Sequence, residues 1–411
     1  MNTKFITLIA TLMILSNCGG GGSDSTVTDT STNTQEEPSN NDDTSNGTTD
    51  TTDDANETQN DNDSPSASTP VDAVVDDGLL ASNEPYYKYS WHIDSANSAT
   101  NDTEDIINKD SDIGVVKAWE ISKGNGIKVA VIDDGFDVAH EDLKANIAVV
   151  RNIDDDNNDV SNTNSDGTAL HGNSCAGFIV SPINGKGSMG IAPQAKLIGI
   201  KLLSSDDSDT IRAFEYAQAQ GAKVISCSWG TNDVSEAIVA KLKELYDAGI
   251  TVLFASGNDG VSLDVAGTND ESEVEWVIGV GASGENNDVT SYSNYGKNLE
   301  VIAPGGDTET LGILGIDDMG SAGSSSQLDL VNNNYAFMDG TSFATPVASG
   351  VVTLMYAINP NITPAQVKTI LTSTATKVGD TKASYVDNFD EKRAYGKINA
   401  YQAVLEAQKL Q

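Results

Sequence analysis

The sequence has few cysteines, few histidines and few basic residues, which disulfide frameworks, metal sites and polyanion-binding surfaces need in larger numbers. Of 411 residues only three are cysteine and three are histidine, and 23 Lys and Arg stand against 61 Asp and Glu. So few cysteines cannot build a disulfide framework. The shortage of basic residues excludes the clusters that nucleic-acid phosphates require, and it disfavours binding to anionic lipid through a basic patch. We therefore expect no nucleic-acid partner.

Basic residues are missing altogether from Gly19 to Tyr87, where 16 Asp and Glu lie among many Ser, Thr, Asn and Gly. Such a segment has too little apolar surface to offset the entropy lost on ordering. We predict a disordered acidic tether over residues 19–84, with a span of about 45 Å as a flexible coil, and one large folded domain over residues 85–411. The domain is acidic too, which indicates solubility or salt tolerance, or attraction of cationic substrates or calcium.

The start of the chain carries a short apolar run, from Phe5 to Leu15. This run cannot span about 30 Å of hydrocarbon but suits a secretory signal. It ends in "LSNC", which resembles the bacterial lipoprotein signal. We predict that residues 1–18 are a lipoprotein-type signal peptide and that Cys18 is lipidated. This would anchor the exported domain in the membrane at the bacterial cell envelope, most simply at the outer membrane. The alternative is an ordinary signal peptide and a secreted protein.

The two remaining cysteines, Cys175 and Cys227, each lie in an apolar stretch. A disulfide between them is one alternative for an exported protein. Free cysteine commonly packs as a small hydrophobic residue, however, so we expect two buried free thiols.

From Gly126 onward, short apolar runs alternate with helical patterns. The runs at 127–132, 195–203, 223–229, 251–257, 274–282 and 299–304 have the length and β-branched content of buried strands. Residues 209–221 and 235–249 are amphipathic and end in Gly, as helices often do. The alternation predicts an α/β fold, with a doubly wound, mostly parallel sheet and helices on both faces. The functional site should lie at the carboxyl ends of the strands.

Four polar motifs are expected at that edge of the sheet. Their central residues are Asp133 in "VIDDG", His171 in "HGNSCAG", Asn258 in "ASGN" and Ser342 in "GTSFATP". A serine at a helix start is usually only a cap. Its hydroxyl reacts only when a neighbouring base takes the proton.

The base has few candidates, because the chain has three histidines. His92 precedes the first expected strand and His140 falls in a polar loop, so we expect structural roles for both. His171 is the best candidate for a general base.

The four motifs, in this order, resemble the subtilase family of serine proteases over about Tyr86 to Gln411. The resemblance implies that Asp133 orients His171, and that His171 takes the proton of Ser342. The amide of Asn258 and the N–H of Ser342 would bind the oxyanion. The activity implied is that of a serine endopeptidase on protein and peptide substrates, through an acyl-enzyme and without a cofactor. Asp134 would be a neighbour of the site and not the orienting acid.

The paired aspartates, the Cys in "HGNSCAG" and the "SWG" segment are closer to the kexin-like members of the family. The resemblance implies that an extended substrate pairs with Ser228, Trp229 and Gly230; for Trp229, ordinary packing is the alternative. Asp233 and Asp264 occupy positions that, in the kexin-like pattern, hold structural calcium or face a basic substrate side chain. The alternative is that both are merely solvated surface acids.

Two other classes of function were weighed. An α/β-hydrolase needs G-x-S-x-G with the His last in the chain, which this sequence does not have. A surface lipoprotein that binds peptides on a non-catalytic protease scaffold stays open as the alternative. Subtilases usually carry a folded propeptide, and the acidic run before Tyr87 cannot be one, so we expect unaided folding or a separate folding chaperone.

Overall fold

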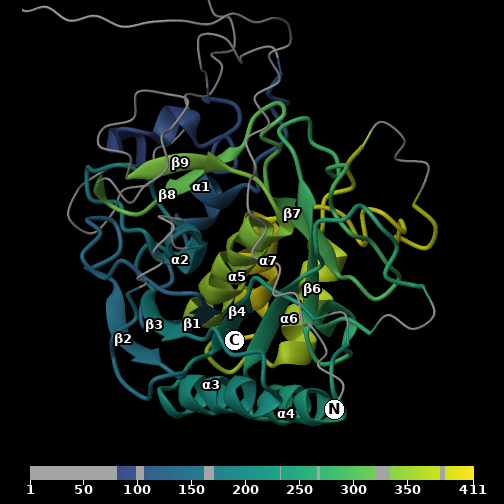
Figure 1. Ribbon diagram of the computed structural model, residues 1–411. Helices are drawn as coiled ribbons and strands as arrows, with labels where there is room; N and C mark the ends of the chain where they lie inside the picture. The colour runs from purple at the N-terminus through teal and green to yellow at the C-terminus, as the bar shows by residue number, and fades with distance from the viewer. Residues whose placement is uncertain are drawn as a thin grey trace, which may run out of the picture. The chain divides into compact units, whose positions relative to one another are not determined.

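The structure is a computed structural model that describes residues 81–98, 106–161, 171–231, 233–265, 269–320, 334–379 and 385–411. Figure 1 shows a central sheet with helices on two sides of it. The predicted signal peptide, Cys18 and all but the last residues of the predicted tether lie outside the described residues.

The sheet has seven parallel strands in the order β2-β3-β1-β4-β5-β6-β7. The strands are β1 (Lys128–Asp133), β2 (Ile147–Asn152), β3 (Lys196–Lys201), β4 (Val224–Cys227), β5 (Thr251–Ala255), β6 (Ile278–Ser283) and β7 (Val301–Pro304). The chain runs from β1 to the edge strand β2, returns to β3 beside β1, and then crosses to the other side of β1 to continue with β4. This reversal between β1 and β4 is where α/β sheets bind their ligands.

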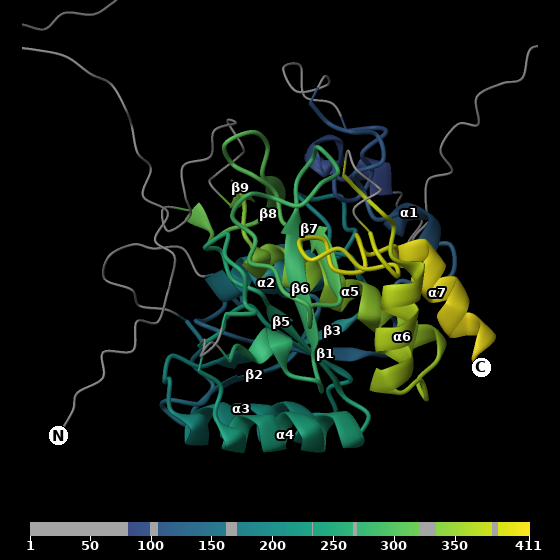
Figure 2. The ribbon, with the colours of Figure 1, turned by 90° about the vertical axis from the view of Figure 1, so that its right-hand side faces the viewer.

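Successive residues of each strand point to opposite faces, and both faces are buried. Val129 and Val131 of β1 pack into the core beneath α2 (His171–Val180) and α5 (Thr341–Ile358). Ala130 and Ile132 pack into the core beneath α3 (Asp207–Ala219) and α4 (Glu236–Asp247). Helices α3 and α4 lie along the lower side of the molecule in both views (Figures 1 and 2). The predicted doubly wound α/β fold is confirmed.

Three further helices in the described part of the chain stand beyond α5: the last helix packs against α5, and the other two pack against that last helix. They are α1 (Val115–Ala118), α6 (Pro364–Thr374) and α7 (Ala400–Lys409), and Figure 2 shows the last two beside each other. Among the described helices only α5 is long and apolar enough to cross a membrane, but 83% of its apolar window is buried inside the protein. Helix α5 is therefore the central helix of the fold.

Some elements differ from the sequence prediction. Strand β2 was not predicted, because it is an edge strand whose residues are mostly half-exposed and do not form an apolar run. The antiparallel pair β8 (Ile313–Ile316) and β9 (Tyr335–Met338) was also missed. Residues 274–277 were predicted as strand but precede β6 as a turn that follows the short 3-10 helix Glu271–Glu273.

The folded part also begins before the predicted boundary at residue 85. Residues Ala81–Asn83 and Tyr87–Tyr89 form short 3-10 helices. Glu84 between them is buried and accepts hydrogen bonds from the backbone N–H groups of Asn184 and Gly185. Both Cys175 and Cys227 are buried and free, as predicted.

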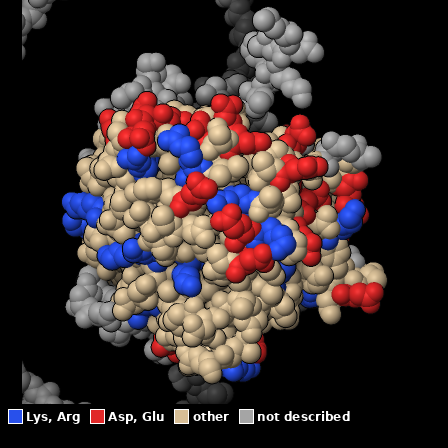
Figure 3. Space-filling view, turned by 90° about the horizontal axis from the view of Figure 1, so that it is seen from below, with Lys and Arg blue, Asp and Glu red and all other residues tan. Residues whose placement is uncertain are grey.

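On the face seen from below, Lys and Arg lie beside Asp and Glu over the upper half of the view, and the lower half is largely uncharged (Figure 3). On α3 and α4, Lys241 contacts Glu215 and Glu244 at 3.4 and 3.1 Å, and Lys243 contacts Asp247 at 2.6 Å. This face therefore has no continuous basic patch that could hold a polyanion.

Candidate active site

The first motif lies at the point where the strand order reverses. Asp133 is the last residue of β1 and His171 is the first residue of α2. His171 Nδ1 lies 2.8 Å from Asp133 Oδ1. Asp133 is buried, whereas about a third of the His171 side chain is exposed. The pair is therefore an acid held inside the protein and an imidazole that reaches its surface.

Asp134 has a different role, which is to cap α2. Its two carboxylate oxygens accept from the backbone N–H groups of His171 and Gly172, at 3.2 and 2.9 Å. These N–H groups have no partner within the helix, so the cap fixes the first turn that carries the imidazole. Gly172 is required here, because a Cβ would lie 2.6 Å from Gly135 O.

The surroundings of His171 favour its charged form. Burial opposes the charge, but the Asp133 carboxylate and the Cys175 sulfur, with their hydrogen bonds to the ring, together hold the pKa of His171 well above 6.5. The sulfur of Cys175 lies 3.7 and 3.9 Å from the two ring nitrogens. Burial raises the pKa of the Cys175 thiol to about 11. The thiol is therefore neutral at pH 7 and leaves Asp133 as the charge that stabilises a protonated ring.

Ser342 lies in the first turn of α5, and Pro346, in the same helix, changes the hydrogen bonding of that turn. Proline has no N–H, so the carbonyl of Ser342, four residues earlier, receives no helical hydrogen bond. This carbonyl instead accepts from the Ser228 hydroxyl at 2.7 Å and from the Cys175 thiol at 3.5 Å. The Phe343 ring packs on the His171 ring at 5.4 Å. These contacts bring the serine turn against both β4 and α2.

The Ser342 hydroxyl itself donates to the carbonyl of Ser228, at 3.2 Å. It is not hydrogen-bonded to His171 in this structure. Reaction would require Oγ to turn from this carbonyl to the imidazole, and such bonds are often formed only once substrate is bound.

Asn258 follows β5 and is held by one end of its amide. Its Oδ1 accepts from the backbone N–H and the hydroxyl of Thr341, at 2.9 and 2.8 Å. The protein therefore occupies Oδ1, and Nδ2 is the atom that can donate to a substrate. Because Thr341 precedes Ser342, the amide and the serine keep a fixed separation.

The arrangement brings together all four residues that the motifs singled out. The sequence pattern described as "Subtilase family" matches residues 124–391. The chain is 33% identical to subtilisin DY of Bacillus licheniformis over 276 residues, which covers 65% of this chain and 92% of that protein. The chain belongs to the subtilase family of serine proteases. As a member of that family it is a serine-type endopeptidase.

Other subtilases are similar over different lengths. The chain is 32% identical to the calcium-dependent protease of Nostoc over 323 residues, which covers 71% of this chain but only 48% of that protein. Among solved structures, a protease of Pseudoalteromonas arctica superposes with a TM-score of 0.65 at 25% identity, over 79% of this chain and 99% of that chain. The serine protease of Aeromonas sobria has the same fold, with a TM-score of 0.64 at 22% identity.

The predicted substrate segment of this subtilase leaves β4 beside the serine. The Trp229 indole donates to Ile132 O at 2.9 Å and packs edge-on against Phe254. Its side chain is therefore used for packing, which leaves its backbone as the part that could pair with a peptide. At Gly230 a Cβ would lie 2.6 Å from Asp270 Oδ2, so any larger residue would displace this carboxylate. Both residues hold the segment close to the sheet edge.

The predicted calcium residues of this subtilase are not a ready-made ion site. Asp264 already pairs with a cation, since its Oδ1 lies 2.9 Å from Lys297 Nζ. Asp233 is exposed. Across the described residues only Asp133, His171 and Cys175 bring three ligand-type atoms within 4.8 Å of one another. A role for Asp233 and Asp264 stays a prediction without a contact that supports it.

The other two histidines of the subtilase are buried away from the serine. His140 accepts from the Asp142 backbone N–H at 3.0 Å, and its Nε2 lies 3.1 Å from Asn334 O. His92 packs edge-on against Trp91 and Phe178. Burial lowers the pKa of His92 to about 3, so its ring is neutral. Both therefore have the structural role predicted for them.

Sequence reasoning missed one cluster of oxygen atoms in this subtilase, formed by Glu84, Asp142 and Asn184. Glu84 and Asp142 are both buried. Asn184 Nδ2 donates to Asp142 Oδ1 at 2.9 Å, and Tyr335 donates to Oδ2 at 2.8 Å. The second oxygen of Glu84, Oε2, is buried without a hydrogen-bond partner. Burial, with a further contribution from Asp142, raises the pKa of Glu84 to about 7. No sequence signal separates Glu84 from the other acids of the acidic run.

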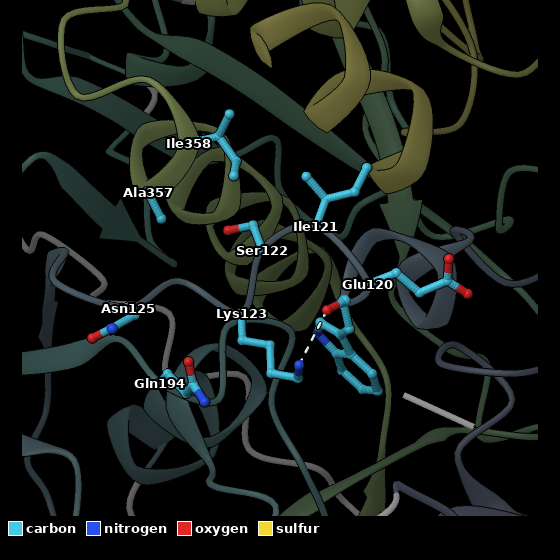
Figure 4. A pocket seen from close by; sticks show the side chains of 9 residues that line it. Glu120, Ile121, Ser122, Lys123, Asn125, Gln194, Ala357 and Ile358 are labelled. Atoms are coloured by element: carbon cyan, nitrogen blue, oxygen red, sulfur yellow. Dashed lines mark hydrogen bonds between the residues drawn. The ribbon is translucent and has the colours of Figure 1, made fainter. Parts of the chain in front are cut away.

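A shallow pocket lies at the opposite edge of the sheet. Its lining includes residues 119–123 and 125 before β1, Gln194 before β3, and Ala357 and Ile358 at the end of α5 (Figure 4). The Lys123 ammonium donates to the carbonyl of Trp119 at 3.2 Å. Because these segments stand at the amino ends of the strands, the pocket is separate from the serine.

Proposed function

We propose that this subtilase cleaves peptide bonds with Ser342 as nucleophile, His171 as general base and Asp133 as the acid that orients the base. The observation that carries the proposal is the 2.8 Å contact between His171 Nδ1 and Asp133 Oδ1. It occupies one ring nitrogen and leaves Nε2 to take the proton of the serine hydroxyl. The raised pKa of His171 means that the protonated ring formed in this step is stabilised.

The reaction then has two halves. Ser342 Oγ attacks the substrate carbonyl carbon while His171 takes the proton, and the oxyanion is stabilised by Asn258 Nδ2, the Ser342 N–H and the N-terminal dipole of α5. His171 returns the proton to the leaving nitrogen as the C–N bond breaks, and an acyl-enzyme remains. Water hydrolyses this ester with His171 again as base. The acyl half of the substrate pairs with the backbone of residues 228–230 by strand addition.

Labelling with a serine-directed fluorophosphonate tests this proposal. We expect the wild type to be labelled and Ser342→Ala to be neither labelled nor active, with the fold intact. Ser349→Ala is the matched control, because this buried serine lies on the same helix and its hydroxyl has no partner. It should be labelled like the wild type. Absence of labelling in the wild type, under conditions that label a subtilisin, would favour the non-catalytic peptide-binding alternative. The hydrogen bond from the Ser342 hydroxyl to Ser228 O would then be the resting contact of a serine that does not react.

We further propose that the chain binds a structural calcium ion at Glu84, Asp142 and Asn184. The carboxylates of Glu84 and Asp142 supply oxygen ligands, as calcium requires, and the partnerless Oε2 of buried Glu84 is the atom such an ion would satisfy. Asn184 now presents Nδ2 to Asp142, so its amide would turn its oxygen toward the ion on binding. Two relatives are named calcium-dependent proteases. The ion would supply positive charge between two carboxylates and would take no part in the chemistry.

We propose that the chain is exported and anchored through lipidated Cys18, with the acidic residues 19–80 as the tether and the folded part beginning at Ala81. The short apolar run that ends in "LSNC" supports this. Stable anchoring needs more than one acyl chain, so detergent-phase partitioning of the wild type should be lost in Cys18→Ser. A wild type that partitions into the aqueous phase would show that the protein is secreted instead.

We also propose that a separate chaperone assists folding. The serine protease of Aeromonas sobria, which has the same fold, has been solved in complex with a chaperone. We expect Ser342→Ala, which cannot digest itself, to refold from denaturant in low yield alone and in higher yield with the chaperone. Full recovery of the fold by the isolated chain would show that it folds unaided.

A further inference from the structure

Three carboxylates without a basic partner lie beside the turn that carries the nucleophile. They belong to Glu285, Asp307 and Asp339, which follow β6, β7 and β9. Within the described part of the chain, no Lys or Arg forms an ion pair with any of them. We name these three residues the leaving-side acids. Asp339 stands three residues before Ser342 in the chain.

The fold holds these acids together. Gly340, between Asp339 and the serine, donates its N–H to Gly305 O and to the Tyr292 hydroxyl, both at 3.0 Å. Tyr292 donates in turn to Gly306 O at 2.6 Å. The turn before the nucleophile is thus tied to the loop after β7, and Asp307 lies on that loop. The position of the negative charge relative to Ser342 is therefore set by backbone contacts.

The acids repel one another. Burial, and then the charge of Asp307, raises the pKa values of Asp339 and of Glu285. Glu285 is only 3% exposed, and its Oε2 is buried without a hydrogen-bond partner. A hydroxyl of the loop after β7, that of Thr310, is hydrogen-bonded to the same carboxyl. A buried acid oxygen without a donor, next to a second acid, is satisfied either by a proton or by a cation.

A bound metal ion is the less suitable cation. The leaving-side acids do not form a group of three ligand atoms within 4.8 Å, as an ion held by all three carboxylates would require. A long side chain with a terminal cation suits separated carboxylates better, because it can lie between them. Asp307 and Asp339 are half-exposed and can be reached from solvent.

The substrate can bring such a cation. Its acyl half is proposed to pair with residues 228–230 on one side of Ser342, and Ser228 contacts the serine from that side. The half released as the amine is then the half that meets the turn at Asp339. An extended peptide advances about 3.3 Å per residue, so the first two residues after the scissile bond lie within reach.

We propose that the leaving-side acids form a subsite for Lys or Arg at one of the first two positions after the scissile bond. This inference rests on the proposed function and names a substrate class for it. Electrostatic complementarity of this kind mainly sets specificity and the rate of association.

Fluorescence-quenched peptides that differ only after the scissile bond test this subsite. For the wild type we expect kcat/KM to be about tenfold higher with Lys than with Gln, and lower still with Glu. Asp307→Asn and Asp339→Asn should each bring the Lys-to-Gln ratio to about one to threefold. Glu215→Gln is the control, because it removes one negative charge on α3, and it should keep the wild-type ratio.

Three results would overturn the subsite. They are a wild-type ratio near one, an unchanged ratio in both Asp variants, and a preference that appears only after chelation, which would mean that the acids hold a metal. An acyl anilide, which has no amino-acid residue after the scissile bond, separates this failure from that of the proposed function. If the anilide is hydrolysed but the peptides show no preference for Lys over Gln, the subsite is contradicted and the proposed function is not. Failure to hydrolyse both the anilide and every peptide removes the proposed function and the subsite with it.

Discussion

At the residue scale, the two ends of the Asn258 amide have separate tasks. Oδ1 accepts two hydrogen bonds from Thr341, and Nδ2 faces the proposed oxyanion. We expect Asn258→Ala to lower kcat by about 10²–10³ with a smaller change in KM, the size of effect established for this amide in subtilisin, a relative of this chain. Steady-state kinetics on one peptide substrate measure it, with Asn125→Ala in the remote pocket as control. An unchanged kcat would remove Asn258 from the site.

The acid and base of the site predict a pH dependence. Only the neutral imidazole can accept the serine proton, and Asp133 holds the pKa of His171 above 6.5. The value of kcat/KM should therefore rise with pH, with a midpoint above 6.5. Asp133→Asn removes the charge that raises the pKa, so the midpoint should move to lower pH while the rate falls by about 10⁴. A midpoint that is the same in both proteins would mean that another group titrates.

The sequence predicted the four motif residues but not the way in which they are held. A strand that ends in "VIDDG" or "ASGN" places a polar residue at the sheet edge by topology alone. The cap made by Asp134 and the bond from the Ser342 hydroxyl to Ser228 depend on side-chain angles that no spacing encodes. The buried position of Glu84 was not predicted, because composition does not distinguish a buried acid from the exposed acids of the same acidic run.

At the scale of the element, the cap that Asp134 forms on α2 should contribute measurably to the free energy of unfolding. Asp134→Ala removes both hydrogen bonds to the first N–H groups of the helix, and loss of a cap costs about 1 kcal/mol. We expect that loss of unfolding free energy in urea, in a Ser342→Ala background that prevents self-digestion. Asp206→Ala is the matched control, because Asp206 is the N-cap of α3 but makes no side-chain cap hydrogen bond. Equal losses in both variants would contradict the capping role.

The elements themselves were predictable where burial is complete. Strands β1 and β3 to β7 are buried on both faces, so their sequences are continuous apolar runs. Strand β2 lies at the sheet edge with Arg151 half-buried, and its pattern resembles that of a loop. The β8–β9 pair is antiparallel and stands outside the large sheet, so the alternation of strand and helix that marks the parallel strands does not mark it.

At the scale of the whole molecule, the buried acids predict how calcium and pH act together. Folded protein without calcium keeps the Glu84 proton up to about pH 7, whereas the unfolded chain loses it near 4.5. The unfolded state then binds fewer protons between these values, so stability without calcium should fall as pH rises from about 4.5 to 7. Calcium should restore it, by more degrees at pH 8 than at pH 5.5.

Thermal unfolding with calcium and with chelator, in the Ser342→Ala background, measures this effect. Glu84→Gln removes the buried charge, so it should melt higher than its parent in chelator at pH 8 and respond less to calcium. Asp264→Asn is the control at the acid that already pairs with Lys297, and its response to calcium should be that of the parent. Identical melting with and without calcium would remove the ion from this proposal.

The packing of α2 against α5 also determines when, during synthesis of the chain, the site can be completed. The thiol of Cys175 touches the carbonyl of Ser342 across 167 residues of sequence. In the order in which the chain is made, the acid and the base come first, the amide follows, and the nucleophile comes last. While the polypeptide is being translated, the unfinished chain therefore contains a base but not yet the serine that the base would activate. It becomes a protease only when most of it has emerged, and it cannot cut itself during its own synthesis.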